Sequence, residues 1–302
     1  MLLRLRTWSL LLVSLTVSST YLIAARAAST DDSNSAGNCC GFGYELLSAK
    51  LDTLDQEIGK VCAEMKLQIS ALNASLKSLA GANKLLYDYP RTCRDDSIKT
   101  SGIYLIQPEK GFQNPFPVRC EQDYEGGGWT VIQHRFDGST NFVRTWNQFK
   151  AGFGHLEGEF WLGLEKVHQL TYSAPHELHV LLEDFEGTQA VAKYEEFVVG
   201  SEHELYKLEK LGAFSGTAGD SLTGHKGKKF STMDRDNDSH ETANCATVYS
   251  GAWWHGKCHS SNLNGLYLKG VTKSYANGMC WKGFKGHNYS LKVSKMMIRN
   301  KV

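Results

Sequence analysis

The stretch Phe230–Gly265, FSTMDRDNDSHETANCATVYSGAWWHGKCHSSNLNG, decides how the rest of this 302-residue chain is interpreted. It begins with acidic residues at alternate positions, Asp234, Asp236 and Asp238. It continues into a short loop that is bounded by two cysteines and rich in aromatic residues. Alternating carboxylates in an irregular segment can direct several oxygens to one point, and calcium takes about six to eight oxygen ligands. The stretch therefore predicts a calcium-braced binding site, with the aromatic loop as a rigid pocket wall.

The spacing of the aspartates excludes one well-known calcium motif. Counted from Asp234, loop position six is Ser239 and position twelve is Cys245, where an EF-hand requires a glycine and a bidentate glutamate. The alternative for any loop rich in Asp and Asn is a plain solvated turn. The residue pattern by itself leaves these two interpretations open.

The N-terminus has the features of a secretory signal peptide. Two arginines precede an apolar run at residues 8–17, and small residues at 25–27 offer a cleavage point. The alternative is an uncleaved anchor, but serine and threonine dilute the run and Arg26 stops it short of a generous membrane span. We expect residues 1–27 to be a signal peptide and the protein to be secreted and extracellular, with no membrane span.

Export determines the chemistry of the eight cysteines, because an oxidising compartment favours disulfides over thiolate metal sites. Cys93 with Cys120, and Cys245 with Cys258, lie in globular-looking sequence at spacings that close modest loops. Cys280 is left over, and it is either buried and free or paired with an unidentified partner.

Residues 47–86 repeat apolar side chains at alternating spacings of four and three. One row falls a heptad apart at each step, at Leu51, Ile58, Met65, Leu72, Leu79 and Leu86. A sustained period of about 3.5 residues is typical of a coiled coil, and the alternative is a single helix docked on a globular domain. Mixed Leu, Ile and Met leave dimer and trimer both open.

The N-terminal cysteines favour the oligomer. Cys39, Cys40 and Cys62 flank this helix or lie within it, and a parallel bundle brings like residues of different chains together. We expect a homo-oligomer with interchain disulfides at these three cysteines. The expected organisation is a Cys-containing segment at residues 28–43, followed by a coiled-coil oligomerisation stalk at residues 44–88.

The sequence after the stalk indicates a different kind of structure. Pro90 ends the helix, since proline restricts the residue before it and cannot continue the hydrogen-bond ladder. From Cys93 the pattern changes to short β-rich runs with few helices. The expected elements are strands at 103–106, 129–132 and 178–182 and helices near 145–150 and 162–170. Beyond Gly212 we expect mostly loop, within one α+β domain at residues 90–302.

Composition and two failed motifs argue against other functions. A formal net charge of +1 without a basic stripe gives nucleic-acid binding no electrostatic basis. The block 219–222, GDSL, matches a hydrolase nucleophile motif, but no histidine has the aspartate that this family places three residues before it. The block 176–179, HELH, is one residue short of the zinc-protease HExxH. His240, His255 and His259 near the cysteines suggest zinc, yet oxidation argues against thiolate ligands. We expect no enzyme.

Short blocks spread over the whole region after Cys93 match one known family. They are GGGWTVI at 126–132, DGS at 137–139, GEFWLGLE at 158–165, GTAGDSL at 216–222, FST at 230–232, NCA at 244–246, WW at 253–254 and SNLNG at 261–265. The chain thus resembles a fibrinogen C-terminal domain, as in fibrinogen-related proteins, tachylectins, ficolins and angiopoietins. The resemblance implies a disulfide-bonded, loop-rich α+β globe with a central antiparallel sheet, here preceded by an α-helical coiled coil.

The resemblance also assigns the calcium ligands and agrees with both disulfide pairs above. By position, the side chains of Asp236 and Asp238 and the backbone carbonyls of His240 and Thr242 would bind a structural Ca²⁺ ion. Asp234, the first aspartate of the run, is not among them.

The same resemblance implies a ligand pocket beside the calcium. In the lectin branch an acetyl group enters an aromatic funnel, where ring faces surround the methyl group and polar groups bind the amide. The matching positions are Tyr249, Cys258, His259, Tyr275 and Ala276, with a further wall from Trp281, Phe284 or Tyr289 and a cis peptide at Lys257–Cys258. Tyr249 stands where the fibrin-polymerising branch has an acidic residue for a peptide amine, and a tyrosine suits a methyl group better.

Together these features predict a secreted, calcium-dependent lectin that binds N-acetylated glycans on microbial or cell surfaces in innate immunity. The alternative is a secreted signalling or matrix ligand for a cell-surface receptor, resembling angiopoietin-like proteins. Sequons at Asn73 and Asn288 predict a glycoprotein, whereas Asn237 lies inside the calcium loop and we expect it to be unmodified. The glycan, the receptor and the number of subunits stay open.

Overall fold

The computed structural model describes residues 41–86, 89–108 and 114–301. Residues 1–40, which hold the expected signal peptide as well as Cys39 and Cys40, lie outside the described residues. The chain divides into two compact units, Met1–Leu86 and Tyr87–Val302. In the described ranges, no helix offers a stretch that is both long and apolar enough to cross a bilayer.

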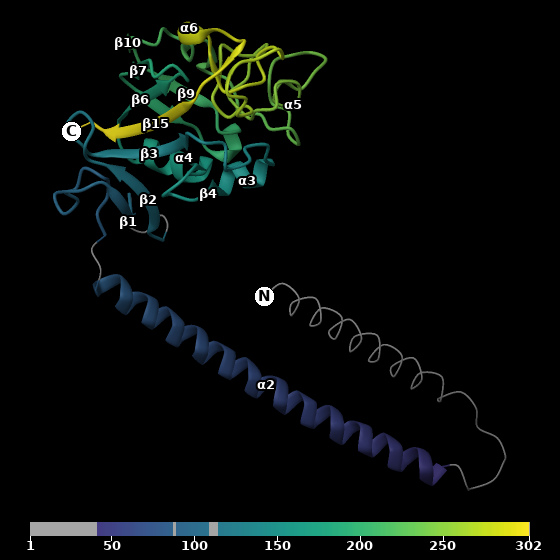
Figure 1. Ribbon diagram of the computed structural model, residues 1–302. Helices are drawn as coiled ribbons and strands as arrows, with labels where there is room; N and C mark the ends of the chain where they lie inside the picture. The colour runs from purple at the N-terminus through teal and green to yellow at the C-terminus, as the bar shows by residue number, and fades with distance from the viewer. Residues whose placement is uncertain (1–40, 87–88, 109–113, 302) are drawn as a thin grey trace. The chain divides into compact units, whose positions relative to one another are not determined.

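The described part of the first unit is the 46-residue helix α2 (Gly41–Leu86; Figure 1). This is the helix that the heptad pattern predicts. Side chains of the heptad row keep between 38% and 63% of their surface exposed at Leu51, Ile58, Met65 and Leu72. Cys62 is exposed and has no disulfide partner within the described residues. A helix with an unburied apolar row is consistent with a coiled coil, which buries such a row against partner helices.

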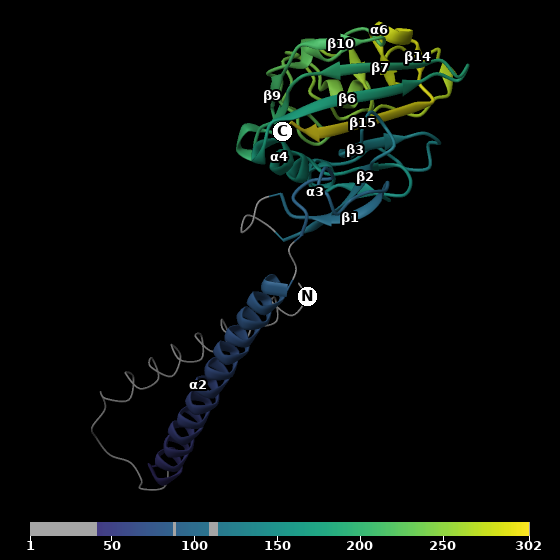
Figure 2. The same cartoon turned by 90° about the vertical axis from the view of Figure 1, so that its left-hand side faces the viewer.

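The second unit is built on an antiparallel sheet with the strand order β1-β2-β3-β15-β6-β7-β10, and Figure 2 shows its strands side by side. Two short strands, β4 and β5, join beside β3. The bounds are β1 Gly102–Ile106, β2 Phe116–Glu121, β3 Trp129–Arg135, β4 Phe153–Gly154, β5 Phe160–Trp161, β6 His176–Glu183, β7 Gln189–Tyr194, β10 Phe214–Gly216 and β15 Val293–Asn300. The expected α+β class with a central antiparallel sheet is confirmed.

Shorter elements complete this unit. The helices are α3 Trp146–Ala151, α4 Leu164–Ser173, α5 Cys245–Val248 and α6 Lys282–Lys285, with 3₁₀ turns η1 Glu202–Glu204 and η2 Thr223–His225. The short strand pairs are β8 Phe197–Val199 with β9 Leu208–Leu211, β11 Ser261–Asn262 with β13 Cys280–Trp281, and β12 Gly270–Val271 with β14 Tyr289–Ser290. The segment between β10 and β14 is largely loop and gathers to one side of the sheet (Figure 1).

The regular elements near the start of this unit follow the sequence pattern. The expected strands correspond to β1, β3 and β6, and the expected helices to α3 and α4. Helix α3 begins where the Thr145 N–H donates to Gln148 Oε1 at 3.0 Å, half of a capping box. It ends at Gly152, whose φ of 92° favours glycine.

Strand β15 corrects the expectation of mostly loop beyond Gly212. Its sequence, VSKMMIRN, pairs with β3 on one side and β6 on the other, so the last strand of the chain is central in the sheet. A register shift between Met296 and Met297 interrupts the alternation, and three consecutive side chains from Met296 to Ile298 are fully buried. Because a period of two is the main sequence signal of a half-buried strand, the bulge conceals this one.

Aromatic side chains fill the core between the sheet and the loop segment. Phe230 packs edge-on against Trp254, with ring centroids 5.3 Å apart, and stacks on Trp161 at 6.0 Å. The Trp254 Nε1–H donates to the backbone oxygen of Tyr206 at 2.8 Å. Trp253 and Trp254 are fully buried. The expectation that these tryptophans help to form a pocket wall is therefore wrong, because they belong to the hydrophobic core.

Two buried polar side chains of β3 hold the loop segment to the sheet. Gln133 Nε2 donates to the Leu263 carbonyl at 3.0 Å. Arg135 donates from one guanidinium nitrogen to the carbonyls of Leu263 and Gly265. The Arg135 guanidinium also lies 4.1 Å from the centroid of the Phe142 ring. Burial lowers the pKa of Arg135 to about 10, while the nearby Glu159 carboxylate acts in the opposite direction.

Glu159 organises the turn that follows β3. Its side chain is buried and accepts four backbone N–H bonds, from Phe136, Asp137, Gly138 and Thr140, at 2.7 to 3.1 Å. A carboxylate can accept all of them because it has only acceptor sites. One acidic side chain therefore satisfies the backbone donors of a whole turn.

We expect Glu159→Gln to lower the free energy of unfolding of the chain by about 2–3 kcal/mol, because an amide cannot accept at both ends and loses the charge-assisted bonds. Glu157→Gln is the matched control. Its side chain is 74% exposed and contacts Arg119 at 3.2 Å, and such a surface pair contributes about 0–1 kcal/mol. Urea unfolding of both variants checks this, and equal effects would contradict the assigned role of Glu159.

Candidate functional site

The loop that carries the expected calcium ligands is fixed at its base. Ser231 and Trp253 exchange backbone hydrogen bonds at 2.9 and 3.2 Å. The Asn237 side-chain amide donates to the Phe230 carbonyl at 2.8 Å, and the Asn237 N–H donates to Ser231 Oγ at 3.0 Å. The amide nitrogen that a glycan would modify is thus engaged inside the loop, in line with an unmodified Asn237. By contrast, Asn73 and Asn288 are exposed.

Asp234 points away from the other two aspartates of the run. Its Oδ1 accepts the Trp146 N–H at 2.9 Å and the Thr232 hydroxyl at 2.8 Å. Asp234 therefore satisfies a free backbone donor at the start of α3 and ties the loop to that helix. This arrangement explains how the first aspartate of the run can have a structural role.

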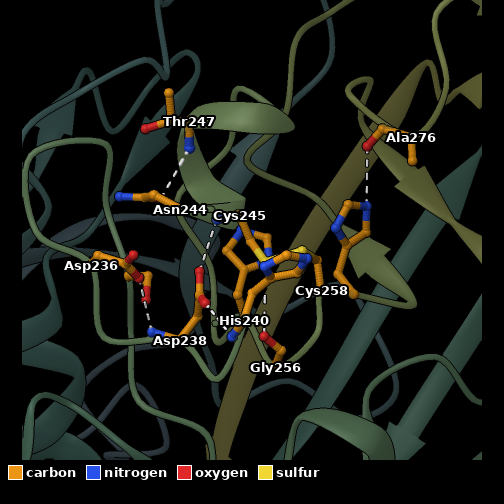
Figure 3. The surroundings of a disulfide bond; sticks show 12 residues. Asp236, Asp238, His240, Asn244, Cys245, Thr247, Gly256, Cys258 and Ala276 are labelled. Carbon is orange, nitrogen blue, oxygen red and sulfur yellow. Dashed lines mark hydrogen bonds between the residues drawn. A yellow bond between two sulfur atoms is a disulfide. The ribbon is translucent and has the colours of Figure 1, made fainter. Parts of the chain in front are cut away.

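Asp236 and Asp238 lie side by side at the edge of the loop (Figure 3). Asp236 Oδ1 accepts the Asp238 N–H at 3.2 Å. Asp238 accepts one N–H at each oxygen, from His240 at 2.7 Å and from Cys245 at 2.8 Å. Each oxygen of a carboxylate has two lone pairs, so these bonds leave further acceptor capacity. Within the described residues, neither carboxylate forms a salt bridge.

The donor set at this loop fits calcium. Two carboxylates without a cationic partner offer hard oxygen ligands, which calcium prefers. In the described part of the chain, no N–H or O–H group bonds the backbone oxygens of His240 and Thr242, so both are available to a cation. The residues that would hold Ca²⁺ are thus Asp236 and Asp238 through their side chains and His240 and Thr242 through their carbonyls.

A disulfide joins this loop to the neighbouring segment. Cys245 bonds Cys258, and Cys93 bonds Cys120, the two pairs that sequence spacing and the family resemblance indicate. Cys245 begins α5 after Asn244, whose Oδ1 accepts the Thr247 N–H at 3.1 Å. The peptide Lys257–Cys258 is cis. His259 directly follows Cys258, so the disulfide ties His259 to the start of α5.

Four rings form a continuous cluster beyond the disulfide. Tyr249 and His259 meet edge to face, with centroids 4.6 Å apart. His259 contacts His287 at 5.7 Å, and His287 contacts Tyr275 at 5.3 Å. Tyr275 is 59% exposed, whereas His259 and His287 are partly buried. Three residues expected at the ligand site thus gather here, and His287 bridges two of them.

Ala276 joins the cluster through its backbone. His259 Nε2 lies 3.0 Å from the Ala276 carbonyl oxygen. The buried Asn262 amide donates to the backbone oxygens of Tyr249 at 3.0 Å and Ala276 at 3.4 Å. Ala276 has a φ of 60°, in the left-handed region. Asn262 therefore fixes two backbone segments that carry expected ligand contacts.

Histidines in this region are held neutral. Burial, followed by the neighbouring His255 and His225, lowers the pKa of His259 to about 3. Burial lowers the pKa values of His225 and His255 to about 4. His225 has a fixed tautomer, because Nδ1 donates to the Trp254 carbonyl at 2.7 Å and Nε2 accepts the Ser260 N–H at 3.1 Å. The cluster therefore carries neutral imidazoles at physiological pH.

The three candidates for a further aromatic wall make their contacts outside the ring cluster. The Trp281 Nε1–H donates to the Gly219 carbonyl at 2.8 Å in the core, and the Tyr289 hydroxyl donates to Glu186 at 2.6 Å. Among the described residues, no ring contact joins Trp281, Phe284 or Tyr289 to Tyr249 or His259. His287 takes this place instead. It was missed because an isolated histidine in a loop has no spacing signal.

Cys280 is buried beside the ring cluster and has no disulfide partner within the described residues. Its sulfur lies 3.9 Å from His259 Nε2 and 3.9 Å from His287 Nδ1. Burial raises the pKa of this thiol to about 12.

The motifs that resemble catalytic signatures are structural. Ser221 is buried, and its Oγ accepts the Gly283 N–H at 2.8 Å. Asp220 accepts the Tyr194 hydroxyl at 2.8 Å and caps the turn that follows. His179 lies in strand β6 with its ring 4.2 Å from that of Trp129. The serine of the hydrolase block is therefore buried in a loop, and the HELH block is part of a strand.

Known proteins resemble this chain over its second unit. The family described as fibrinogen beta and gamma chains, C-terminal globular domain, matches residues 89–301. Human fibrinogen C domain-containing protein 1 is 50% identical over 203 residues, which are 66% of this chain and 43% of that protein. Bovine microfibril-associated glycoprotein 4 is 49% identical over 218 residues, which are 70% of this chain and 85% of that protein. The chain thus spans less than half of the human relative.

Solved structures share the fold. The fibrinogen-like globe domain of human ANGPTL2 has a TM-score of 0.68 at 44% identity, covering 70% of this chain and 100% of that one. The lamprey fibrin D-dimer, complexed with the peptide Gly-His-Arg-Pro-amide, has a TM-score of 0.62 at 31% identity, covering 85% and 91%. None of these relatives is named as an enzyme.

The neutral, buried His225 predicts acid sensitivity. Its pKa is lowered on folding, so the unfolded chain binds the extra proton and stability present above about pH 6.5 is lost as pH falls toward 4. Between pH 6.5 and 4.5 this one group accounts for about 2 kcal/mol of the free energy of unfolding. We expect His225→Gln to show a shallower pH dependence in urea unfolding over this range. His203→Gln, at an exposed histidine, is the control, and equal slopes in both variants would contradict the role of His225.

Proposed function

Because this chain belongs to the family of fibrinogen C-terminal globular domains, we propose that it is a secreted, non-enzymatic recognition protein that binds N-acetylated sugars with the help of calcium. The observation that carries the proposal is the junction at the Cys245–Cys258 disulfide. On one side lie the carboxylates of Asp236 and Asp238, and on the other lies the ring cluster.

Calcium would supply positive charge that holds the carboxylate loop in one conformation. Residues of the chain itself connect this loop to the ring cluster. Asp238 accepts the N–H of Cys245, and Cys245 is bonded to Cys258, which precedes His259. A conformation fixed at Asp238 is therefore passed through one disulfide to the ring cluster. We propose that sugar binding depends on calcium because calcium fixes the conformation of this loop.

The ring cluster suits an acetamido group. The Tyr249 and His259 rings meet at an interplanar angle of 87°, so a face and an edge are presented to a small apolar group. Burial keeps His259 uncharged, so its ring can lie against an apolar methyl group without a counter-ion. The Ala276 N–H already donates to the His287 carbonyl, so we assign the amide polar atoms to the backbone groups of the neighbouring Tyr275. No acidic side chain is placed at position 249 to attract an amine.

Helix α2 would raise the avidity of weak single sites. Its exposed heptad row would be buried in a homo-oligomer, with Cys39, Cys40 and Cys62 forming interchain bridges. Linked binding sites gain apparent affinity on repetitive surfaces without any new contact. We therefore propose microbial or cell-surface glycans as the targets, with a role in innate immunity and with glycosylation at Asn73 and Asn288.

One observation favours a second function. The fibrinogen-like globes of human ANGPTL2 and ANGPTL6 are 44% and 48% identical to this chain. A secreted signalling or matrix ligand that binds a cell-surface receptor through the same face is therefore the alternative. The two functions differ in their ligand: one needs a small acetylated sugar and the other needs a protein surface.

The lectin proposal predicts that the oligomer binds N-acetylglucosamine in calcium and is released by EDTA, while glucose, which lacks the acetamide, does not bind. Tyr249→Ala should weaken sugar binding by about tenfold or more, since one contact worth about 1–2 kcal/mol is lost. Isothermal titration calorimetry on the intact oligomer measures both effects.

Tyr172→Ala is the matched control, because this tyrosine of α4 is 70% exposed and lies outside the loop. Its sugar affinity should equal that of the wild type. If N-acetylglucosamine fails to bind and Tyr249→Ala changes nothing, the lectin proposal is wrong and the receptor-ligand alternative gains support.

The stalk proposal predicts that replacing Met65 and Leu72 by lysine dissociates the oligomer, because two charges enter the heptad row of every chain. The matched control replaces Leu67 and Ala74 by lysine, which adds the same charge seven residues apart but off the row. Sedimentation velocity of both variants, with interchain disulfides reduced, gives the mass. An unchanged mass in the Met65/Leu72 variant would overturn the stalk.

A further inference from the structure

Three metal-binding side chains meet beside the ring cluster. They are His259, Cys280 and His287, and their ligand atoms all lie within 4.8 Å of one another. The Cys280 sulfur is 3.9 Å from His259 Nε2 and 3.9 Å from His287 Nδ1. The sulfur is therefore placed almost symmetrically between two imidazole nitrogens.

Three separate chain segments bring these side chains together. His259 follows the Cys245–Cys258 disulfide, and Cys280 lies in β13, paired with Asn262 of β11. The backbone oxygen of His287 accepts the Ala276 N–H at 3.2 Å. Each ligand is thus anchored by its own backbone contact rather than by one flexible loop, which is what a preformed site needs.

The spacing agrees with a small tetrahedral ion. Zinc bonds of about 2.0–2.1 Å to nitrogen and about 2.3 Å to sulfur place the ligand atoms of a tetrahedron about 3.4–3.6 Å apart. The two sulfur–nitrogen distances exceed this value by a few tenths of an ångström. All three ligand atoms lie within 4.8 Å of one another, so binding the ion requires these side chains to move closer together.

The proton of the His259 imidazole can move between its two nitrogens, so that one of them can bind a cation. His259 Nε2 now faces the Ala276 carbonyl, so it carries the proton in that arrangement. His259 Nδ1 is buried and, among the described residues, has no hydrogen-bond partner. A cation at Nε2 would move the ring proton to Nδ1, which is free to carry it. The cation then replaces the hydrogen bond to Ala276.

We propose that His259, Cys280 and His287 form a site for a borderline-soft divalent transition-metal ion such as Zn²⁺, with the fourth coordination position left for water. The set of two imidazoles and one thiol matches ligands that Zn²⁺ accepts and calcium does not. Export argues against thiolate sites in general, but Cys280 is fully buried and lacks a disulfide partner in the described part of the chain. It can therefore stay a thiol until the ion binds, when it would lose its proton to water and bind the ion as the thiolate.

This site is chemically separate from the calcium loop. Asp236 and Asp238 offer only oxygens, whereas the His259–Cys280–His287 cluster offers only nitrogen and sulfur. Saturating calcium therefore blocks oxygen-based binding of other cations without occupying the cluster. An experiment in excess calcium thus isolates the proposed site, and it needs no sugar.

The test is Co²⁺ binding to the full oligomeric chain in excess calcium, followed by ultraviolet and visible absorption. Co²⁺ takes the tetrahedral position of Zn²⁺ and reports a sulfur ligand by a charge-transfer band. We expect this band in the wild type and its loss on adding Zn²⁺. Cys280→Ser should remove the band and weaken Zn²⁺ binding by more than about tenfold, the loss that even outer partners of a metal site cause.

Two further variants complete the test. His287→Gln removes a partly exposed ligand without changing the buried thiol, so it covers the case in which Cys280→Ser does not fold. It should also weaken Zn²⁺ binding by more than about tenfold. Cys62→Ser, at an exposed cysteine on α2, should leave the band unchanged. A wild type without the band, or a band that persists in both cluster variants, overturns the proposal.

Discussion

The candidate site depends on a buried polar contact between the sheet and the loop segment. Gln133 and Arg135 of β3 bond the carbonyls of Leu263 and Gly265, so a largely irregular segment is fixed to the central sheet. Unpaired carbonyls buried at this place would cost free energy, and a charged guanidinium buried without acceptors would cost more. The two carbonyls and one terminal nitrogen of the Arg135 guanidinium satisfy each other. The Phe142 ring and the Glu159 carboxylate complete the surroundings of Arg135.

Beyond this contact, single hydrogen bonds fix the segments that carry the ring cluster. Asn262, one residue before Leu263, bonds the backbones of Tyr249 and Ala276, which belong to two segments at the ring cluster. His225 fixes the segment after His259 by accepting the Ser260 N–H. These bonds require buried polar side chains that are neutral, and they require the His225 imidazole to be in one tautomer. The same burial that lowers the pKa values of the histidines therefore also gives the cluster a single geometry.

Local patterns in the sequence predict some parts of this arrangement. Heptad spacing predicts α2, and short β-rich runs predict β3 and β6. The family blocks point to Asp236 and Asp238 ahead of Asp234, and the bond from Trp146 to Asp234 gives a physical reason for that choice. What the sequence does not reveal depends on contacts between distant segments. A bulge hides β15, burial turns Trp253 and Trp254 into core residues, and only the fold brings His287 next to His259.

The two proposed ions would act on one chain of covalent and hydrogen bonds. Asp238 accepts the Cys245 N–H, the disulfide joins Cys245 to Cys258, and His259 follows. Calcium at the carboxylates would order this connection from one end, while a transition metal at the His259–Cys280–His287 cluster would hold its other end. On the proposed function, the two ions would have opposite effects on sugar binding. Calcium would leave the His259 ring free to face an acetyl group, whereas a cation on Nε2 would engage that ring and add positive charge beside Tyr249. On the proposed function, Zn²⁺ would thus compete with the acetylated ligand that calcium favours.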